Sequence, residues 1–290
     1  MKIGISCNHN NFGKIYGDGV YLKLKEFGFD AIDFNGLADT ENMYYTLPET
    51  ESDKLLLHHK ALAAEAGIEI SQVHGPWRWP PKETTDEGRA VRLLEMKKSI
   101  RLASVLGCKR WVVHPIMPFG IEDIGTGNEN ATWELNCAFM RELIKTAHEY
   151  DVTICFENMP MHKFSIATPE RILEFAREMN DEKFRICLDT GHVQVFGCNG
   201  MKLGEETRRL AGYIECLHVH DSKQERDLHL FPTFGAADWK DFSRALKDID
   251  YKGVFSLEVC PPTDLSLPIF EDATRLLINI TREVMGYAGL

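Results

Sequence analysis

Long apolar runs and paired cysteine motifs are missing from this sequence of 290 residues. No segment approaches the roughly 20 consecutive apolar residues that a membrane-spanning helix needs, and the first residues lack the basic start and apolar stretch of a secretory signal. The 8 cysteines include no C-x-x-C pair, which disfavours a zinc ribbon or a disulfide scaffold. We therefore expect a cytoplasmic protein with reduced thiols and no membrane partner.

Positive charge is also scarce, since 33 Lys and Arg residues are outnumbered by 44 Asp and Glu residues, which gives a net charge of −11. A protein that binds nucleic acid neutralises phosphates with Lys and Arg, so this balance counts against DNA or RNA as a partner. No segment rich in Pro, Gly and Ser marks a linker, and the composition is that of a globular protein. A single domain spanning 1–290 is expected.

Short apolar runs alternate along the chain with longer segments of helical period. The runs predict eight strands, at 2–7, 31–35, 70–74, 110–115, 153–158, 185–190, 215–220 and 254–259. Helices are predicted between them, for instance at 85–106, 129–150, 169–180, 239–248 and 268–285. Gly28, Gly67 and Gly107 stand where a helix must end before the next strand begins.

This regular alternation indicates a parallel sheet, and eight βα units favour an α/β fold closed into a (β/α)8 TIM barrel. An open doubly wound sheet is the competing fold. It is disfavoured because no predicted strand leads into the G-x-G-x-x-G turn of dinucleotide-binding proteins.

Acids and imidazoles stand at the carboxyl ends of the predicted strands, where barrels place their catalytic groups. They are His74, His114, Glu157, Asp189, His218, His220 and Glu258, with His192 just beyond the sixth strand. A lone histidine at such a place is more often structural, but a buried cluster of acids and imidazoles is costly unless a cation compensates. The cluster therefore favours one divalent metal, and its mainly oxygen ligands suit Mn, Mg, Co or Zn alike.

Three cysteines each precede one of these strand-end residues by two positions. Side chains two apart on a strand share a face, so Cys155, Cys187 and Cys216 are expected to point into the barrel one layer below the acids and imidazole. Small packing residues are the expected role, and a second metal site made of thiolates is the less favoured alternative.

Short phrases at the strand ends carry a resemblance to a known family. The phrases are Val73-His74-Gly75-Pro76, Val113-His114-Pro115, Phe156-Glu157-Asn158, Leu188-Asp189-Thr190-Gly191-His192, Leu217-His218-Val219-His220-Asp221, Asp227-Leu228-His229, Gly235-Ala236-Ala237-Asp238-Trp239 and Leu257-Glu258-Val259. In this order, over nearly the whole chain, they resemble the xylose isomerase-like barrel superfamily. That superfamily includes ketose 3-epimerases, inosose-handling enzymes, hydroxypyruvate isomerase and endonuclease IV.

The resemblance implies a metal-dependent sugar isomerase or epimerase. It places the metal on Glu157, Asp189, His218 and Glu258, with His218 chosen over His220 because the family's ligand stands three residues before an acid, here Asp221. Glu157 and Glu258 would remove and return a proton through an enediolate. The expected substrate contacts are His74, His114, His192, His220, Asp227, His229 and Trp77. Trp79, in the same loop, is a further candidate, with loop packing as the equal alternative for both tryptophans.

Alternative functions remain open at this point. Nine residues match the ligands of the trinuclear phosphodiesterase endonuclease IV: His74, His114, Glu157, Asp189, His192, His218, Asp227, His229 and Glu258. The acidic charge balance disfavours this function. A dehydratase acting on a keto-inositol or keto acid would use the same site, and a sugar-binding barrel without turnover is expected to lack an acid or base, which this chain does not.

The substrate is less well defined by the resemblance. Ketose 3-epimerases carry a further Glu shortly after the first metal Glu, whereas this chain reads Met161-His162-Lys163 there, which puts a simple ketohexose in doubt. A sugar phosphate bound near Lys223 or Arg226 is a further alternative, although solvated surface charge is the favoured role of these two residues. The sequence is compatible with a homo-oligomer.

Overall fold

The computed structural model describes residues 1–8, 10–78, 81, 83–224 and 226–290. Eight strands form the main sheet: β1 (Ile3–Cys7), β2 (Ala31–Phe34), β3 (Glu69–His74), β4 (Arg110–Val113), β5 (Thr153–Glu157), β6 (Phe184–Asp189), β7 (Ile214–His218) and β10 (Phe255–Leu257). They pair in the order β10-β1-β2-β3-β4-β5-β6-β7, and every pairing is parallel.

The two outer strands of this order meet and close the barrel. A parallel bridge joins Val219 to Leu257, with Val219 N–H donating to the Ser256 carbonyl at 2.8 Å and Glu258 N–H donating to the Val219 carbonyl at 3.0 Å. The (β/α)8 barrel expected from eight βα units is therefore confirmed, and β7 and β10 are held together just where His218 and Glu258 leave their strands.

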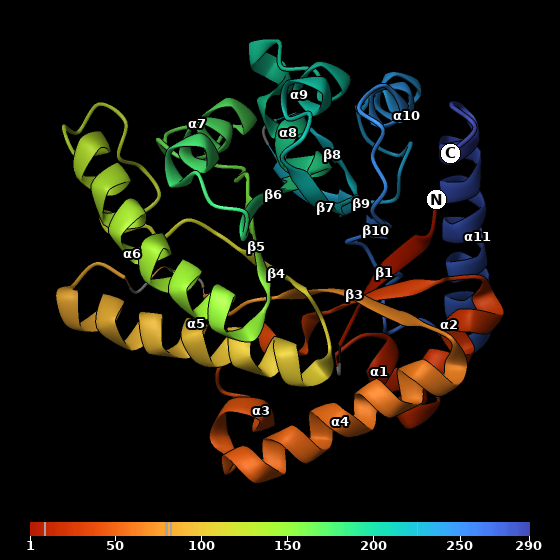
Figure 1. The fold of residues 1–290 in the computed structure, drawn as a ribbon. Helices are drawn as coiled ribbons and strands as arrows, with labels where there is room; N and C mark the ends of the chain where they lie inside the picture. Colours follow the sequence, from red (N-terminus) through yellow and green to blue (C-terminus); the bar gives the residue numbers. More distant parts are fainter. Residues whose placement is uncertain (9, 79–80, 82, 225) are drawn as a thin grey trace.

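Helices surround the strands on the outside (Figure 1). The helical segments are α1 (Phe12–Tyr16), η1 (Gly17–Gly19), α2 (Val20–Phe27), η2 (Asn35–Leu37), α3 (Met43–Thr46), α4 (Glu49–Ala66), α5 (Asp86–Leu106), α6 (Glu129–Tyr150), α7 (Pro169–Met179), α8 (Thr190–Val195), η3 (Phe196–Asn199), α9 (Leu203–Arg209), α10 (Trp239–Asp248) and α11 (Leu267–Gly286). The last helix, α11, contacts both α10 and α2, so the ring of helices closes as the sheet does. Among the described residues, no helix combines the length and apolar character needed to cross a membrane.

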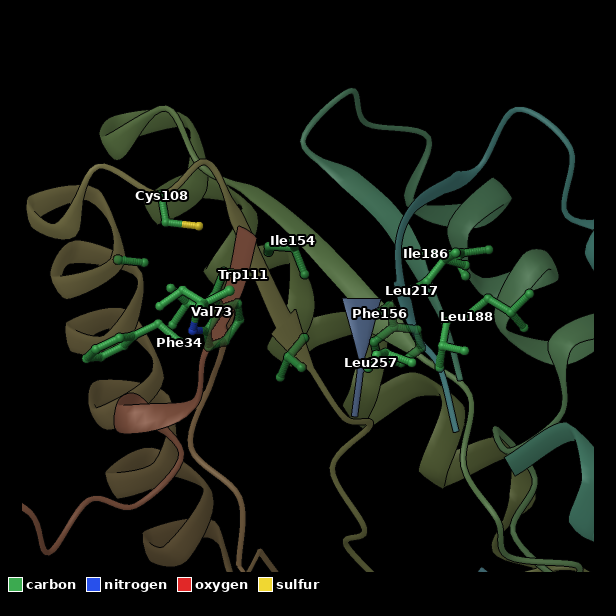
Figure 2. Close-up of a cluster of buried hydrophobic side chains, with 14 of the residues drawn as sticks. Phe34, Val73, Cys108, Trp111, Ile154, Phe156, Ile186, Leu188, Leu217 and Leu257 are labelled. Carbon is green, nitrogen blue, oxygen red and sulfur yellow. The ribbon is translucent and has the colours of Figure 1, made fainter. Parts of the chain in front are cut away.

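Alternate residues of each strand face different environments. The side chains that face the helices are large and apolar, as Figure 2 shows for Phe34, Val73, Trp111, Phe156, Leu188, Leu217 and Leu257, and they belong to the main hydrophobic core. The barrel interior instead holds a separate small cluster of Val112, Cys155, Cys187 and Cys216. The three cysteines are thus small buried packing residues inside the barrel, as the two-residue spacing predicts.

Helix ends agree with the signals in the sequence. Gly28, Gly67 and Gly107 follow α2, α4 and α5 with left-handed φ values of 103°, 66° and 86°. Residues with a Cβ resist this conformation, so glycine ends each helix at low cost. Each glycine N–H also donates to a carbonyl of the last helical turn, which lets the chain reverse directly into the next strand.

A short antiparallel hairpin follows β7 and was not among the predicted elements. Its strands are β8 (Asp221–Lys223) and β9 (Arg226–Leu230), and they form a sheet of their own. The hairpin escaped prediction because its residues are charged and mostly exposed, so they show no apolar periodicity. It carries Asp227 and His229 to the carboxyl end of the barrel.

One asparagine fixes the loop after β4. The Asn136 side chain on α6 is fully buried, accepts from Ile116 N–H at 2.8 Å and donates to the Ile116 carbonyl at 2.9 Å. It therefore pairs with the loop backbone as a neighbouring strand would, two residues beyond His114.

We predict that Asn136→Ala lowers the free energy of unfolding by about 2–4 kcal/mol, because both buried backbone groups of Ile116 lose their partners. Urea denaturation measures the loss. Asn128→Ala is the matched control, since Asn128 precedes the same helix without a side-chain cap hydrogen bond, and its effect should stay within about 0.5 kcal/mol. Equal losses in the two variants would contradict the assigned role of Asn136.

Candidate metal and active site

The barrel places the predicted site residues at one mouth. His74, Glu157, Asp189 and His218 are the last residues of β3, β5, β6 and β7, and His114 and Glu258 directly follow β4 and β10. His192 lies on α8, His220 lies between β7 and β8, and Asp227 and His229 lie on β9. All ten residues of this set thus come to the carboxyl end of the barrel.

A cavity of about 190 Å³ opens at this mouth. Its lining consists of Asn35, Ala38, His74, Trp77, His114, Glu157, Met159, Pro160, Met161, His192, Asp227, His229 and Glu258. Asp189, His218 and His220 are fully buried and form the layer below this lining. The predicted substrate contacts therefore lie around the cavity, except for His220, which lies beneath it.

Glu157 is the centre of one group of imidazoles. Its Oε1 lies 3.1 Å from Nδ1 of His218, and its Oε2 lies 3.1 Å from Nε2 of His114 and 3.6 Å from Nε2 of His74. Burial would raise the pKa of Glu157, but His218 and His114 hold it well below its ordinary value. Burial lowers the pKa of His114 to about 4, so this imidazole is neutral and has a lone pair to offer.

Asp189 is the centre of a second group. Its Oδ2 lies 3.0 Å from Nε2 of His220, and its Oδ1 accepts the N–H of His192 at 2.7 Å, which caps α8. Asn158, the residue after β5, fixes the backbone of this aspartate: its side chain accepts Asp189 N–H at 2.8 Å and donates to the Asp189 carbonyl at 3.0 Å. The position of Asp189 is therefore set by hydrogen bonds to both its backbone N–H and its backbone carbonyl.

The hairpin closes one side of the site. Asp227 Oδ2 lies 3.4 Å from Nε2 of His192 and 3.3 Å from Nε2 of His229. The His229 ring is parallel to that of His220, with centroids 4.0 Å apart, and its Nδ1 lies 2.8 Å from the Glu258 carbonyl oxygen. The two imidazoles lower the pKa of Asp227 although its burial acts the other way, so this carboxylate is ionised.

Glu157 and Glu258 approach one imidazole nitrogen. Nδ1 of His218 lies 3.1 Å from Oε1 of Glu157 and 3.4 Å from Oε2 of Glu258, although the two glutamates come from β5 and from the residue after β10. Burial raises the pKa of Glu258, while that of Glu157 is lowered, so their environments differ. The two glutamates named from the sequence are thus brought to a common point.

Two acids important for this arrangement were missed by sequence reasoning. Asp33 on β2 is fully buried, and its Oδ2 lies 3.0 Å from Nε2 of His218. The available signal was an acid within an otherwise apolar predicted strand, which is rare in a buried position without a partner. Asp221 was used only to choose between His218 and His220.

Asp221 proves to be the anchor of the hairpin and of the loop that follows it. Its Oδ1 accepts N–H groups from Ser222, Ala236 and Ala237 at 2.9, 3.0 and 3.2 Å, and its Oδ2 accepts from the Trp239 indole at 2.8 Å. Both carboxylate oxygens of Asp221 are thus used by hydrogen bonds within the fold. Asp221 is therefore a structural residue that holds Asp227 and His229 over the site.

Some of the residues in the surrounding loops line the cavity and others do not. Trp77 lines the cavity and packs edge-on against His114, with ring centroids 4.5 Å apart. Met161 is also in the lining, where the epimerase pattern would favour a glutamate. Lys223 and Arg226 are exposed and outside the lining, so the structure does not support the proposed phosphate contact. Trp79 lies outside the described residues.

Several overlapping sets of three donors could hold a divalent cation. Ligand atoms within 4.8 Å of one another occur in the sets His74-His218-Glu258, His74-His114-Glu157, Glu157-Cys187-His218, Asp189-His192-His220 and His220-His229-Glu258. Among the described residues, none donates a hydrogen bond of good geometry to the buried Oε2 of Glu157, although Nε2 of His114 lies 3.1 Å away. A buried carboxylate oxygen with free lone pairs among several imidazoles is the arrangement that a metal ligand needs.

A second cavity, of about 470 Å³, lies at the opposite, amino-terminal mouth and includes Lys2, Glu69, Arg110 and Glu215 in its lining. These charges are paired with each other, Lys2 with Glu69 and Arg110 with Glu215, each at 2.7 Å. In barrels of this kind the amino-terminal mouth serves stability. The larger cavity is therefore not the candidate active site.

Comparison with known proteins agrees with this geometry. A family model described as "Xylose isomerase-like TIM barrel" matches residues 22–278. The chain belongs to this family. The resemblance stated from the strand-end phrases is thereby confirmed, and the match includes every site residue named above.

Relatives within the xylose isomerase-like family include two types of enzyme. D-psicose 3-epimerase of Enterocloster bolteae is 25% identical over 244 residues, which cover 81% of this chain and 74% of that protein. A probable endonuclease 4 of Mycoplasmopsis synoviae is 24% identical over 266 residues, covering 84% and 90%. The crystal structure of a D-tagatose 3-epimerase-like protein matches with a TM-score of 0.75 and 22% identity, covering 100% of both chains, which shows a common fold.

We predict that Gly191→Ala destabilises the protein, although Ala normally stabilises a helix relative to Gly. A Cβ at Gly191 on α8 would overlap the His220 imidazole, and overpacking of this kind costs roughly 1–3 kcal/mol. The free energy of unfolding from urea titration measures it. Gly197→Ala is the control, because its Cβ would meet Gln224 Cγ at an ordinary 3.5 Å. A neutral or stabilising Gly191→Ala would refute the predicted overlap.

The metal-free protein should lose stability as the pH rises above neutrality. Burial would lower the pKa of His192, but Asp189 and Asp227 outweigh it and raise the pKa from 6.5 to about 10. The folded state holds the His192 proton more tightly than the unfolded state. Its contribution to the free energy of unfolding is therefore complete below pH 6.5 and is lost as the pH rises towards about 10.

Asp227→Asn should flatten this decline, because it removes one of the carboxylates that hold the His192 proton. The test is the free energy of unfolding of chelator-treated protein at intervals across this pH range. Asp264→Asn, which removes an exposed acid from the loop before α11, is the control and should keep the wild-type slope. Equal slopes for Asp227→Asn and wild type would contradict the assigned coupling.

Proposed function

We propose that this protein is a metal-dependent sugar isomerase or epimerase in which Glu157 and Glu258 transfer a proton to and from a substrate carbon. The observation that carries the proposal is the convergence of these two glutamates, from strands that are not neighbours, on Nδ1 of His218 at 3.1 and 3.4 Å. A family that includes a D-psicose 3-epimerase 25% identical to this chain supports the same class of reaction.

The metal would be held by Glu157, Asp189, His218 and Glu258, of which Asp189 and His218 form the floor of the site. A divalent cation there would act as a Lewis acid on the substrate carbonyl and stabilise the negative charge that develops on oxygen. The mixed oxygen and nitrogen donors suit Mn, Mg, Co or Zn.

Proton transfer is assigned to the two glutamates because both line the cavity and they come from strands that are not neighbours in the barrel. Glu157 leaves β5, and Glu258 leaves β10 next to the hairpin, so a substrate carbon between them would present one face to each carboxylate. One carboxylate would remove the proton and the other would return one to the opposite face of the same carbon, which inverts it; a proton returned to the former carbonyl carbon, with a hydroxyl proton moved between the two oxygens, would shift the carbonyl instead. His74, His114 and His192 line the same cavity and would bind substrate oxygens.

The lining favours an uncharged substrate. Among the described residues that line the cavity there is no Lys or Arg to bind a phosphate. The apolar part of the lining consists of Ala38, Trp77, Met159, Pro160 and Met161. A neutral sugar or inosose, with its reacting oxygens toward the acids and imidazoles and its carbon skeleton against Trp77, fits this division.

A phosphodiesterase remains the second candidate because one specific observation favours it. Nε2 of His192 and Nε2 of His229 lie 3.4 and 3.3 Å from Asp227 Oδ2, while His114 and His218 contact Glu157. His192 lies between the two carboxylates, with its Nδ1 3.7 Å from Glu157 Oε1, so the site has enough donors for more than one cation. The relative described as a probable endonuclease 4 is 24% identical to this chain. The net charge of −11 and the cavity lining without Lys or Arg among its described residues argue for the sugar enzyme.

We predict about one tightly bound divalent metal per chain and metal-dependent uptake of solvent deuterium at a carbon next to the carbonyl of a neutral ketose or inosose. Glu157→Gln and Glu258→Gln should each reduce this exchange by at least about 100-fold, because an amide cannot accept the proton. Elemental analysis and proton NMR measure the two quantities.

Glu206→Gln is the matched control, since Glu206 is a buried glutamate on α9 paired with Arg209 outside the cavity, and it should exchange at the wild-type rate. Retained exchange in either active-site variant would remove that residue from the mechanism. Loss of water from an inosose instead of exchange alone would change the class to dehydratase. Efficient nicking of abasic-site DNA with zinc, without sugar exchange, would replace the proposal by the phosphodiesterase.

A further inference from the structure

The buried residue Asp33 is not among the metal or substrate residues proposed above. It lies on β2, across the barrel interior from β7, and is 0% exposed. Its Oδ2 lies 3.0 Å from Nε2 of His218. A carboxylate in the interior of a barrel is costly unless it is paired, so its presence calls for a specific partner, and His218 is that partner.

Gln72 fixes Asp33 in place. Its side-chain amide donates to Asp33 Oδ2 at 3.3 Å and to the carbonyl of Leu217 at 3.2 Å. Leu217 directly precedes His218 on β7, so one amide group on β3 links the aspartate and the backbone of the histidine. Gln72 therefore fixes both the Asp33 carboxylate and the backbone next to His218, which sets the distance between them.

The two nitrogens of His218 face different surroundings. Nε2 faces Asp33 deep in the barrel, whereas Nδ1 faces Glu157 Oε1 at 3.1 Å and Glu258 Oε2 at 3.4 Å. An imidazole that donates a proton from one nitrogen to a carboxylate presents a lone pair on the other, and the carboxylate also makes that lone pair more basic. Only Nδ1 is on the side of the two glutamates.

We infer that Asp33 is a positioning residue that retains the Nε2 proton of His218 and thereby makes Nδ1 the metal-binding nitrogen. The inference rests on the metal site of the proposed function, but not on the sugar chemistry. It assigns Asp33 a role through His218 alone, because Asp33 is not in the cavity lining.

The direct test uses the protein labelled with ¹⁵N-histidine and loaded with ¹¹³Cd, a spin-active substitute for the native cation. Scalar coupling between ¹¹³Cd and ¹⁵N identifies the bound nitrogen, and a His218→Gln variant assigns the signal. We expect coupling to Nδ1 of His218 and a retained proton on Nε2. Coupling to Nε2, or to no nitrogen of His218, would overturn the inference.

Affinity measurements give the second arm. Asp33→Ala should raise the dissociation constant for Zn²⁺, from competition with a chelator, about 10- to 100-fold, and Asp33→Asn should fall between Asp33→Ala and wild type because an amide oxygen still accepts the Nε2 proton. Ser71→Ala is the matched control. Ser71 is buried on β3 and donates to the Ile32 carbonyl at 2.9 Å, so it joins β2 to β3, the strands of Asp33 and Gln72, without contacting His218.

The outcomes separate this inference from the proposed function. A general loss of structure predicts similar weakening in Ser71→Ala and Asp33→Ala, and that result would overturn the inference, as would a folded Asp33→Ala with wild-type affinity. Nδ1 coupling and weakened binding in Asp33→Ala, together with no exchange on any sugar, would sustain the role of Asp33 and reject the sugar function. Wild-type protein that binds no divalent cation would reject both.

Discussion

The cost of burying several carboxylates together is the constraint on which the carboxyl-terminal mouth of this barrel depends. Glu157 and Asp189 are almost fully buried, and each is held by imidazoles at 3.0–3.1 Å. Without these partners, or a cation in their place, the carboxylates would repel each other in a medium that screens charge poorly. The imidazoles therefore make this buried cluster of acids compatible with a stable fold.

The alternation of side chains along the strands makes this arrangement compatible with a stable core. Large apolar side chains such as Trp111 and Phe156 pack against the helices, outside the sheet, so the hydrophobic core does not need the barrel interior. The interior is filled by thiols, by Gln72 and by Asp33. Polar residues at the strand ends can therefore converge over this floor without displacing the packing that holds the barrel together.

Much of the fold and part of the site could be predicted from the sequence. The eight strands and the glycines that end α2, α4 and α5 follow from local patterns, since periodicity and left-handed glycine reflect interactions within a few residues. Asp33 and the charged hairpin carry no such pattern. Asp33 matters through its contact with His218, which is 185 positions away in the sequence, and no local pattern reveals such a contact.

The sequence by itself determined the order of strands and helices and the residue types at the strand ends, because both follow from the spacing of residues that are close together in the chain. Only the tertiary structure decided which of these residues meet. Closure of β7 on β10 brings Glu258 to His218, Asp33 contacts Nε2 of that imidazole, and Asp221 holds the hairpin that carries Asp227 and His229. These relations depend on distances across the barrel, which exist only once the sheet has closed.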